Sequence, residues 1–198
     1  MTDTPSTTSQ AILGLLSLRS WSTYELAKQA QRSLEWFWPR AERKLYDEPK
    51  RLVAAGLASA DREMTGARPR TVYSVTRKGR TALRRWLSEP PAAPTLEFEG
   101  MVKVFFADGG SLEQLRTTLV RVAETAEVRR AQLWANVSEN LGPDSAFPER
   151  QHLSTLGVRF HLDHEQLVAD WARWALVQTE QWASTTDPAG WDPLRALD

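Results

Sequence analysis

The sequence predicts a mostly α protein of two parts, in which a helical N-terminal part with one β-hairpin is followed by a C-terminal part of long helices. Two β-forming segments between residues 57 and 77 are joined by a Gly/Pro/Arg turn and flanked by helical patterns. Apolar positions keep helical spacing for about thirty residues after position 111. The proline-rich segment SEPPAAPT at 88–95 cannot continue a helix and separates the parts. We therefore expect domains at 9–90 and 95–185.

The composition bounds the class of protein. With 198 residues, 41% of them apolar, the chain can bury a core without disulfides, and with no cysteine it has neither disulfides nor thiolate metal sites. No segment has the roughly 20 apolar residues of a membrane span, and MTDTPSTTSQ lacks the basic and apolar regions of a signal peptide. We expect a cytoplasmic protein.

The net charge of zero hides an uneven distribution. Residues 1–90 hold 16 Lys and Arg against 9 Asp and Glu, a net charge of +7, and residues 91–198 hold the reverse, −7. Chance clustering of solvated charges is the simplest explanation. Because the division falls at the proline-rich joint, we favour two functional halves, of which the first suits a polyanion.

Two scaffold helices open the chain. The pattern AILGLLSL predicts a nearly buried helix from Ser9, with its apolar face formed by Ile12, Leu15, Leu16 and Leu18. After Trp21, the segment Ser22-Thr23-Tyr24-Glu25 is a capping box, which predicts a second helix to about Ser33 with Leu26, Ala27 and Ala30 facing inward.

A basic third helix is expected from Pro39, a residue suited to the first helical position, to Gly56. Its inner positions are Leu45, Leu52 and Val53, and its outer face carries Arg40, Arg43, Lys44, Lys50 and Arg51. Pro49 predicts a kink or a break between Leu45 and Pro49. We expect Asp47 and Glu48 to turn toward Lys44, Lys50 or Arg51.

A hairpin and a fourth helix complete this half. Leu57–Glu63 and Thr71–Arg77 read as strands around the turn MTGARPR, and residues 76–90 as a helix with Leu83, Trp86 and Leu87 inward. A basic helix followed at once by a basic hairpin is the layout of a winged helix-turn-helix, which predicts DNA binding.

The segments LYDEPKRLVAAGLASADRE and GARPRTVYSVTRKGRTAL resemble the PadR family of winged-helix transcriptional regulators in the order and spacing of several motifs. These are the Leu-Tyr pair, Lys-Arg-Leu before Ala-Gly-Leu, the Arg-Pro-Arg wing, the aromatic of the return strand and Thr-x-x-Gly. Where the family commonly has Pro after the Tyr and Leu three residues after it, this chain has Asp47 and Pro49. MVKVFFADGGSLEQL resembles the start of the C-terminal dimerisation domain of longer PadR-like proteins, which implies a homodimer.

Three helices are expected in the second half. Thr95 could cap a short helix with an apolar stripe formed by Phe98, Met101, Val102, Phe105 and Phe106. A capping box at 111–114 then opens a helix that ends before Gly142-Pro143. The last helix, roughly 149–184, carries a stripe at Leu153, Leu156, Phe160, His164, Leu167, Trp171, Trp174, Gln178 and Trp182. Helices this long need a partner, so we predict a long-helix dimerisation domain and a homodimer through the C-terminal helices.

The candidate DNA-binding residues are Arg40, Arg43, Lys44, Tyr46, Lys50, Arg68 and Arg70. An Arg near the start of a recognition helix can pair with guanine, while Lys and Tyr more often touch phosphate. The wing arginines Arg68 and Arg70 would meet phosphate or the minor groove. A solvated basic face explains any single one of them, and Tyr46 could equally pack inside. Aromatic side chains at Trp134, Trp171 and Trp174 are candidates for binding a small aromatic effector, although packing is the commoner role of such stripes.

We expect no cofactor and no metal, because His161 and His164 have no further visible ligands and zinc requires three or four; a pH-sensitive hydrogen bond fits them better. The favoured hypothesis is a sequence-specific transcriptional regulator, a repressor acting as a homodimer on a palindromic operator. The alternative is a winged-helix module that binds another protein and no operator. An enzyme has little support, because no phosphate loop, nucleophile elbow or HExxH motif is present.

Overall fold

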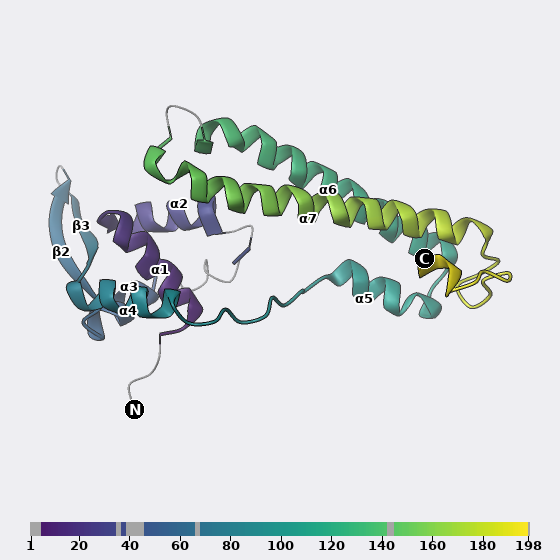
Figure 1. The fold of residues 1–198 in the computed structure, drawn as a ribbon, viewed down its shortest axis with the longest axis horizontal. Helices are drawn as coiled ribbons and strands as arrows, with labels where there is room; N and C mark the ends of the chain where they lie inside the picture. The colour runs from purple at the N-terminus through teal and green to yellow at the C-terminus, as the bar shows by residue number, and fades with distance from the viewer. Residues whose placement is uncertain (1–4, 35–36, 39–45, 66–67, 142–144, 198) are drawn as a thin grey trace. The chain divides into compact units, whose positions relative to one another are not determined.

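The computed structural model describes residues 5–34, 37–38, 46–65, 68–141 and 145–197. The chain forms two compact units, residues 1–94 and 95–198 (Figure 1). The predicted third helix from Pro39 to Leu45 lies outside the described residues, as do Gly142 and Pro143. No helix in the described ranges is long and apolar enough to cross a membrane.

Helices α1 (Thr7–Leu18) and α2 (Thr23–Leu34) form as the apolar spacing and capping box predict. Ser22 N donates to Glu25 Oε2 across 2.9 Å, and Glu25 N donates to Ser22 Oγ across 3.3 Å, so the capping box is confirmed. The predicted apolar face of α1 is buried at Ile12, Leu15 and Leu16. The N-cap of α1 is Ser6, so the helix begins slightly before the predicted start at Ser9.

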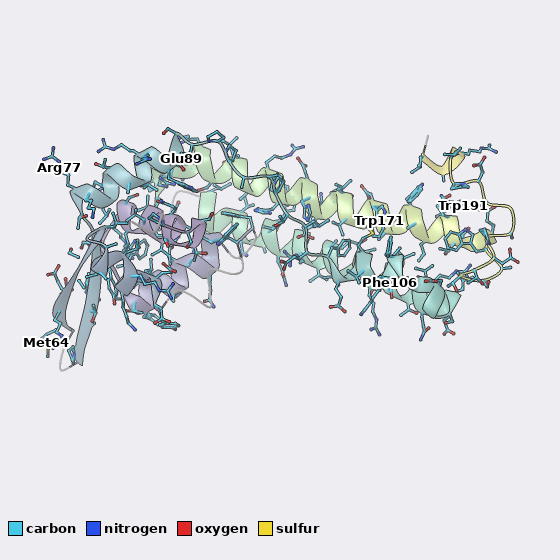
Figure 2. The ribbon with its side chains drawn as sticks, turned by 90° about the horizontal axis from the view of Figure 1, so that it is seen from below. Met64, Arg77, Glu89, Phe106, Trp171 and Trp191 are labelled. Carbon is cyan, nitrogen blue, oxygen red and sulfur yellow. The ribbon has the colours of Figure 1, made fainter. Side chains whose placement is uncertain are left out.

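Three strands form an antiparallel sheet in the order β1-β3-β2. The hairpin pairs β2 (Ala58–Thr65) with β3 (Arg68–Val75), and the two-residue strand β1 (Trp21–Ser22), which the sequence did not predict, pairs with β3 at Tyr73 and Val72. The hairpin extends away from the helices of this unit, with Met64 near its end (Figure 2).

Helices α3 (Glu48–Ala54) and α4 (Arg77–Leu87) flank the hairpin in sequence. Tyr46 and Asp47 form a turn and Pro49 lies in the first turn of α3, so the described residues match a helix that begins at Glu48. Proline is tolerated there because its missing N–H has no helical acceptor. The inward position predicted for Leu87 is wrong, since that side chain is exposed.

The second unit is built on α6 (Leu112–Leu141) and α7 (Gln151–Gln178), which run side by side, with α5 (Glu99–Phe105) packed on α6 (Figure 1). The predicted capping box at 111–114 is confirmed by reciprocal bonds of 2.8 and 3.2 Å between Ser111 and Gln114. Thr95 does not cap α5, because the N-cap is Phe98. The last helix ends at Gln178, earlier than predicted, and continues as a 3-10 turn over Thr179–Gln181.

The face of α7 that packs within the chain differs from the predicted stripe. Its buried residues are His161, Leu162, Glu165, Ala169 and Ala172, whereas most of the predicted apolar stripe is exposed, at Leu153, Leu156, Phe160, Leu167 and Trp174. On α6 the buried positions are Leu115, Leu119, Ala126 and Leu133. The buried residues of α7 thus include the small Ala169 and Ala172, while several of its larger apolar side chains are exposed.

Candidate nucleic-acid interface and effector cavity

The basic N-terminal unit presents α3 and the β2–β3 hairpin as its candidate DNA-binding surface. Arg40, Arg43 and Lys44 lie outside the described residues, and so does the side chain of Arg68. Tyr46, Lys50 and Arg70 are described, and all three are exposed. The exposure of Tyr46, 61%, favours the predicted surface role over packing inside.

Asp47 and Glu48, at the start of α3, turn toward basic side chains, as the sequence predicts. Lys50 Nζ donates to Asp47 Oδ1 across 3.5 Å, with both side chains largely in solvent. Arg51 Nη1 donates to Glu48 Oε1 across 3.3 Å. The burial of Glu48 was not predicted, because an acidic residue in a basic helix reads as a surface residue.

In the hairpin, Arg70 bonds to acidic neighbours. Its Nη2 donates to Glu63 Oε2 on β2 across 2.9 Å, and its Nη1 lies 4.0 Å from Glu25 Oε2 on α2. The Ser22 hydroxyl and amide, with smaller contributions from the charges of Arg19 and Arg70, lower the pKa of Glu25. Arg70 is thus held along the hairpin by the side chains of Glu63 and Glu25.

Two residues of α4 hold the helix ends that border this surface. Lys78 Nζ donates to Ala55 O across 2.8 Å, where the negative end of the α3 dipole attracts a cation. Arg80 Nη1 donates to Ser17 O near the end of α1 across 3.3 Å. Neither contact was predicted, because sequence alone does not show which carbonyl a lysine or arginine reaches.

In the second unit, a cavity of about 740 Å³ lies among α5, α6 and α7. Phe98 and Trp171 meet edge to face in its wall, with ring centroids 5.9 Å apart. Lys103, Arg121, Glu165 and His164 supply polar groups to the lining, and Trp171 lies within the helical pair in Figure 2. Of the three tryptophans predicted for an effector, Trp171 lines this cavity, whereas Trp134 and Trp174 are exposed and do not.

Histidine does not form a metal site in the described part of the chain, where no cluster of three or more His, Cys, Asp or Glu residues could hold an ion. His161 is buried on α7, and its pKa is lowered mainly by burial, with the charge of His164 next in size. Phe160 packs against both histidine rings, edge-on to His161 and stacked on His164.

Comparison with known families and proteins gives two consecutive matches along the chain. Residues 12–85 match the profile described as "Transcriptional regulator PadR-like family", and residues 99–180 match "Virulence activator alpha C-term". The chain is 30% identical over 98 residues to the negative transcriptional regulator PadR of Bacillus subtilis, an alignment that covers 48% of this chain. It covers 54% of that protein, so the chain spans about half the length of this curated relative.

Solved structures share the fold over most of the chain. Bacillus subtilis PadR in complex with operator DNA superposes with a TM-score of 0.74 at 21% identity, covering 87% of this chain and 98% of that one. The same protein in complex with p-coumaric acid gives 0.71 over the same shares. The Vibrio cholerae virulence activator AphA gives 0.67 at 26% identity, over 86% and 96% of the two chains.

Proposed function

We propose that this chain, whose residues 12–85 match the PadR-like family of transcriptional regulators, is a sequence-specific DNA-binding regulator, a repressor that acts as a homodimer on a palindromic operator. The observation that carries the proposal is the family match over residues 12–85, which falls on a unit with the winged-helix elements and a net charge of +7 over residues 1–90. The relatives named above are transcriptional regulators, which favours a regulatory function over an enzymatic one.

The proposed DNA-binding residues are Arg40, Arg43, Lys44, Tyr46, Lys50, Arg68 and Arg70. The exposed side chains of Tyr46 and Lys50 beside α3 support this set, and so does the position of Arg70 along the hairpin. In a winged helix the recognition helix reads the major groove, and phosphate contacts fix its register.

The proposed homodimer is supported by the exposed apolar side chains of α5 and α7, because groups of exposed apolar residues often mark interaction sites. A dimer would present two recognition helices to half-sites about 34 Å apart. A proposed small aromatic effector would occupy the cavity beside Trp171, whose ring wall and mixed lining suit a planar molecule with polar groups.

The test is selection of bound sequences from a random DNA pool, with binding measured at several salt concentrations. We expect a palindrome, and an affinity that falls steeply with salt because several phosphates are contacted. Replacing Arg43 and Lys44 together with alanine should abolish specific binding and leave the dimer intact. A protein-binding module would instead give no enriched sequence and no salt-dependent DNA affinity.

A further inference from the structure

A buried polar network joins α1 to α3. Ser9 Oγ lies 2.9 Å from Ser6 Oγ at the N-cap of α1, and it donates to Glu48 Oε2 across 2.8 Å. Glu48 is only 3% exposed and lies in the first turn of α3. Its carboxylate is therefore fixed from inside the domain by a helix 39 residues away in sequence.

The other oxygen of the same carboxylate holds a side chain that reaches solvent. Glu48 Oε1 accepts from Arg51 Nη1 across 3.3 Å, and the side chain of Arg51 is 71% exposed. Since a guanidinium has five N–H donors in a rigid fork, this contact leaves donors that can bind an anion bidentately. The guanidinium of Arg51 is thus exposed to solvent and held at Nη1 by Glu48.

The adjacent pair provides a contrast on the same turn. Lys50 and Asp47 are both largely exposed, so neither end of their ion pair is fixed by the core. Such pairs contribute little and leave long side chains free to move. Arg51 loses less conformational freedom on binding than Lys50 does, because Glu48 already restricts it.

Stability does not by itself account for a carboxylate at position 48. Burying a carboxylate is costly, and an apolar residue of similar volume often stabilises a core better than an ion pair does. Pro49 and Leu52 already bury apolar surface of α3 in this domain. Burial also keeps the negative charge of Glu48 off a surface that would face phosphates.

We propose that Arg51 binds a backbone phosphate of DNA and that Glu48, held by Ser9, is the positioning residue that orients it. This inference rests on the proposed DNA-binding function. It adds a phosphate contact on α3 and assigns its geometry to a network that begins at the N-cap of α1.

The test compares Glu48→Gln, Arg51→Ala and the double variant in the full chain, using fluorescence anisotropy with labelled duplex DNA of random sequence over a salt series. Random DNA suffices because phosphate contacts are independent of sequence. Arg51→Ala should weaken binding about tenfold and lower the salt slope by about 0.9. Glu48→Gln should also weaken binding, although it makes the protein more positive, and should have no further effect in the Arg51→Ala background.

Asp47→Asn is the matched control. It also removes one negative charge, but from the neighbouring residue, whose side chain is exposed. It should leave affinity unchanged or raise it. Equal or tighter binding by Glu48→Gln would overturn the inference, and so would a Glu48→Gln defect that persists without Arg51, since that would indicate a general disturbance of α3. Failure of the unmodified protein to bind DNA would overturn the proposed function instead.

Thermal unfolding of each variant separates orientation from folding. If Glu48→Gln lowers the unfolding temperature markedly, Ser9→Ala takes its place, because that change keeps both charges and removes only the donor that anchors the carboxylate. It should weaken DNA binding only when Arg51 is present. Unchanged affinity in a folded Ser9→Ala protein would mean that the network does not position Arg51.

Discussion

Glu165 on α7 accepts a hydrogen bond from Arg129 on α6, with Oε1 and Nε 2.7 Å apart. The Glu165 side chain is 7% exposed and that of Arg129 45%, so the carboxylate is buried within the helical pair and the guanidinium covers it from the edge. Because a hydrogen bond between charged groups is directional, this pair favours one register of α7 on α6.

Arg129→Ala should therefore lower the free energy of unfolding by about 2 kcal/mol, since it removes a charged donor from a buried carboxylate. Urea unfolding at a fixed protein concentration measures the loss. Arg173→Ala is the control, because Arg173 also pairs across α6 and α7, with Glu127, but both side chains are about half exposed. That change should cost less than about 1 kcal/mol, and equal losses would contradict the importance of burial.

The lowered pKa of His161 predicts a stability that falls on acidification. Burial disfavours the charged imidazole, and His164 and Arg129 act in the same direction while Glu165 opposes them. The unfolded chain binds a proton near the ordinary value of 6.5, whereas the folded chain does so only at lower pH. Stability should thus be complete above the unfolded pKa and decrease as pH falls from there toward the folded pKa.

Urea unfolding between neutral and mildly acidic pH measures this slope, and His161→Phe should flatten it. The exposed His152 provides the control, since His152→Gln should leave the pH dependence unchanged. If His161→Phe retains the full slope, other groups account for the acid sensitivity.

Gly79 on α4 should not tolerate a side chain. A Cβ there would lie 2.0 Å from the backbone oxygen of Leu57, which accepts hydrogen bonds from the amide and hydroxyl of Thr76. Gly79→Ala should therefore lower unfolding stability by at least about 2 kcal/mol, because backbone must shift. Gly14→Ala on α1, where a Cβ meets nothing within 4 Å, should instead be neutral or stabilise by up to about 1 kcal/mol. Calorimetry of the two variants tests the opposite signs.

Local chemistry made much of this fold predictable. Each of the capping boxes that begin at Ser22 and Ser111 consists of only four consecutive residues, so a helix start can be recognised from them directly. Both boxes form in the structure. The strand at Trp21 was missed because two residues carry no periodicity and the strand exists only through pairing with Tyr73. The burial of Glu48 was likewise missed because its partner Ser9 is distant in sequence.

The face of α7 shows a different limit of sequence reasoning. Apolar residues cover more than one side of this helix, so periodicity alone cannot assign which side packs on α6. The large side chains suggested one seam, yet the buried apolar residues of α7 are Leu162, Ala169 and Ala172. The seam formed by Leu153, Leu156, Phe160 and Leu167 is exposed, and its spacing of three, four and seven residues is that of a helix-packing stripe.

This exposed seam gives a direct test of the homodimer. Replacing Leu156 and Phe160 together with glutamate would place two charges where the second copy is proposed to pack, so dissociation should rise by at least about a hundredfold. Analytical ultracentrifugation over a concentration series measures it, and circular dichroism checks that the helices persist. Ser154→Glu adds a charge at an exposed position of α7 outside this seam and should leave the assembly unchanged. A double variant that stays dimeric would locate the interface elsewhere, with the apolar side chains of α5 as the next surface to alter.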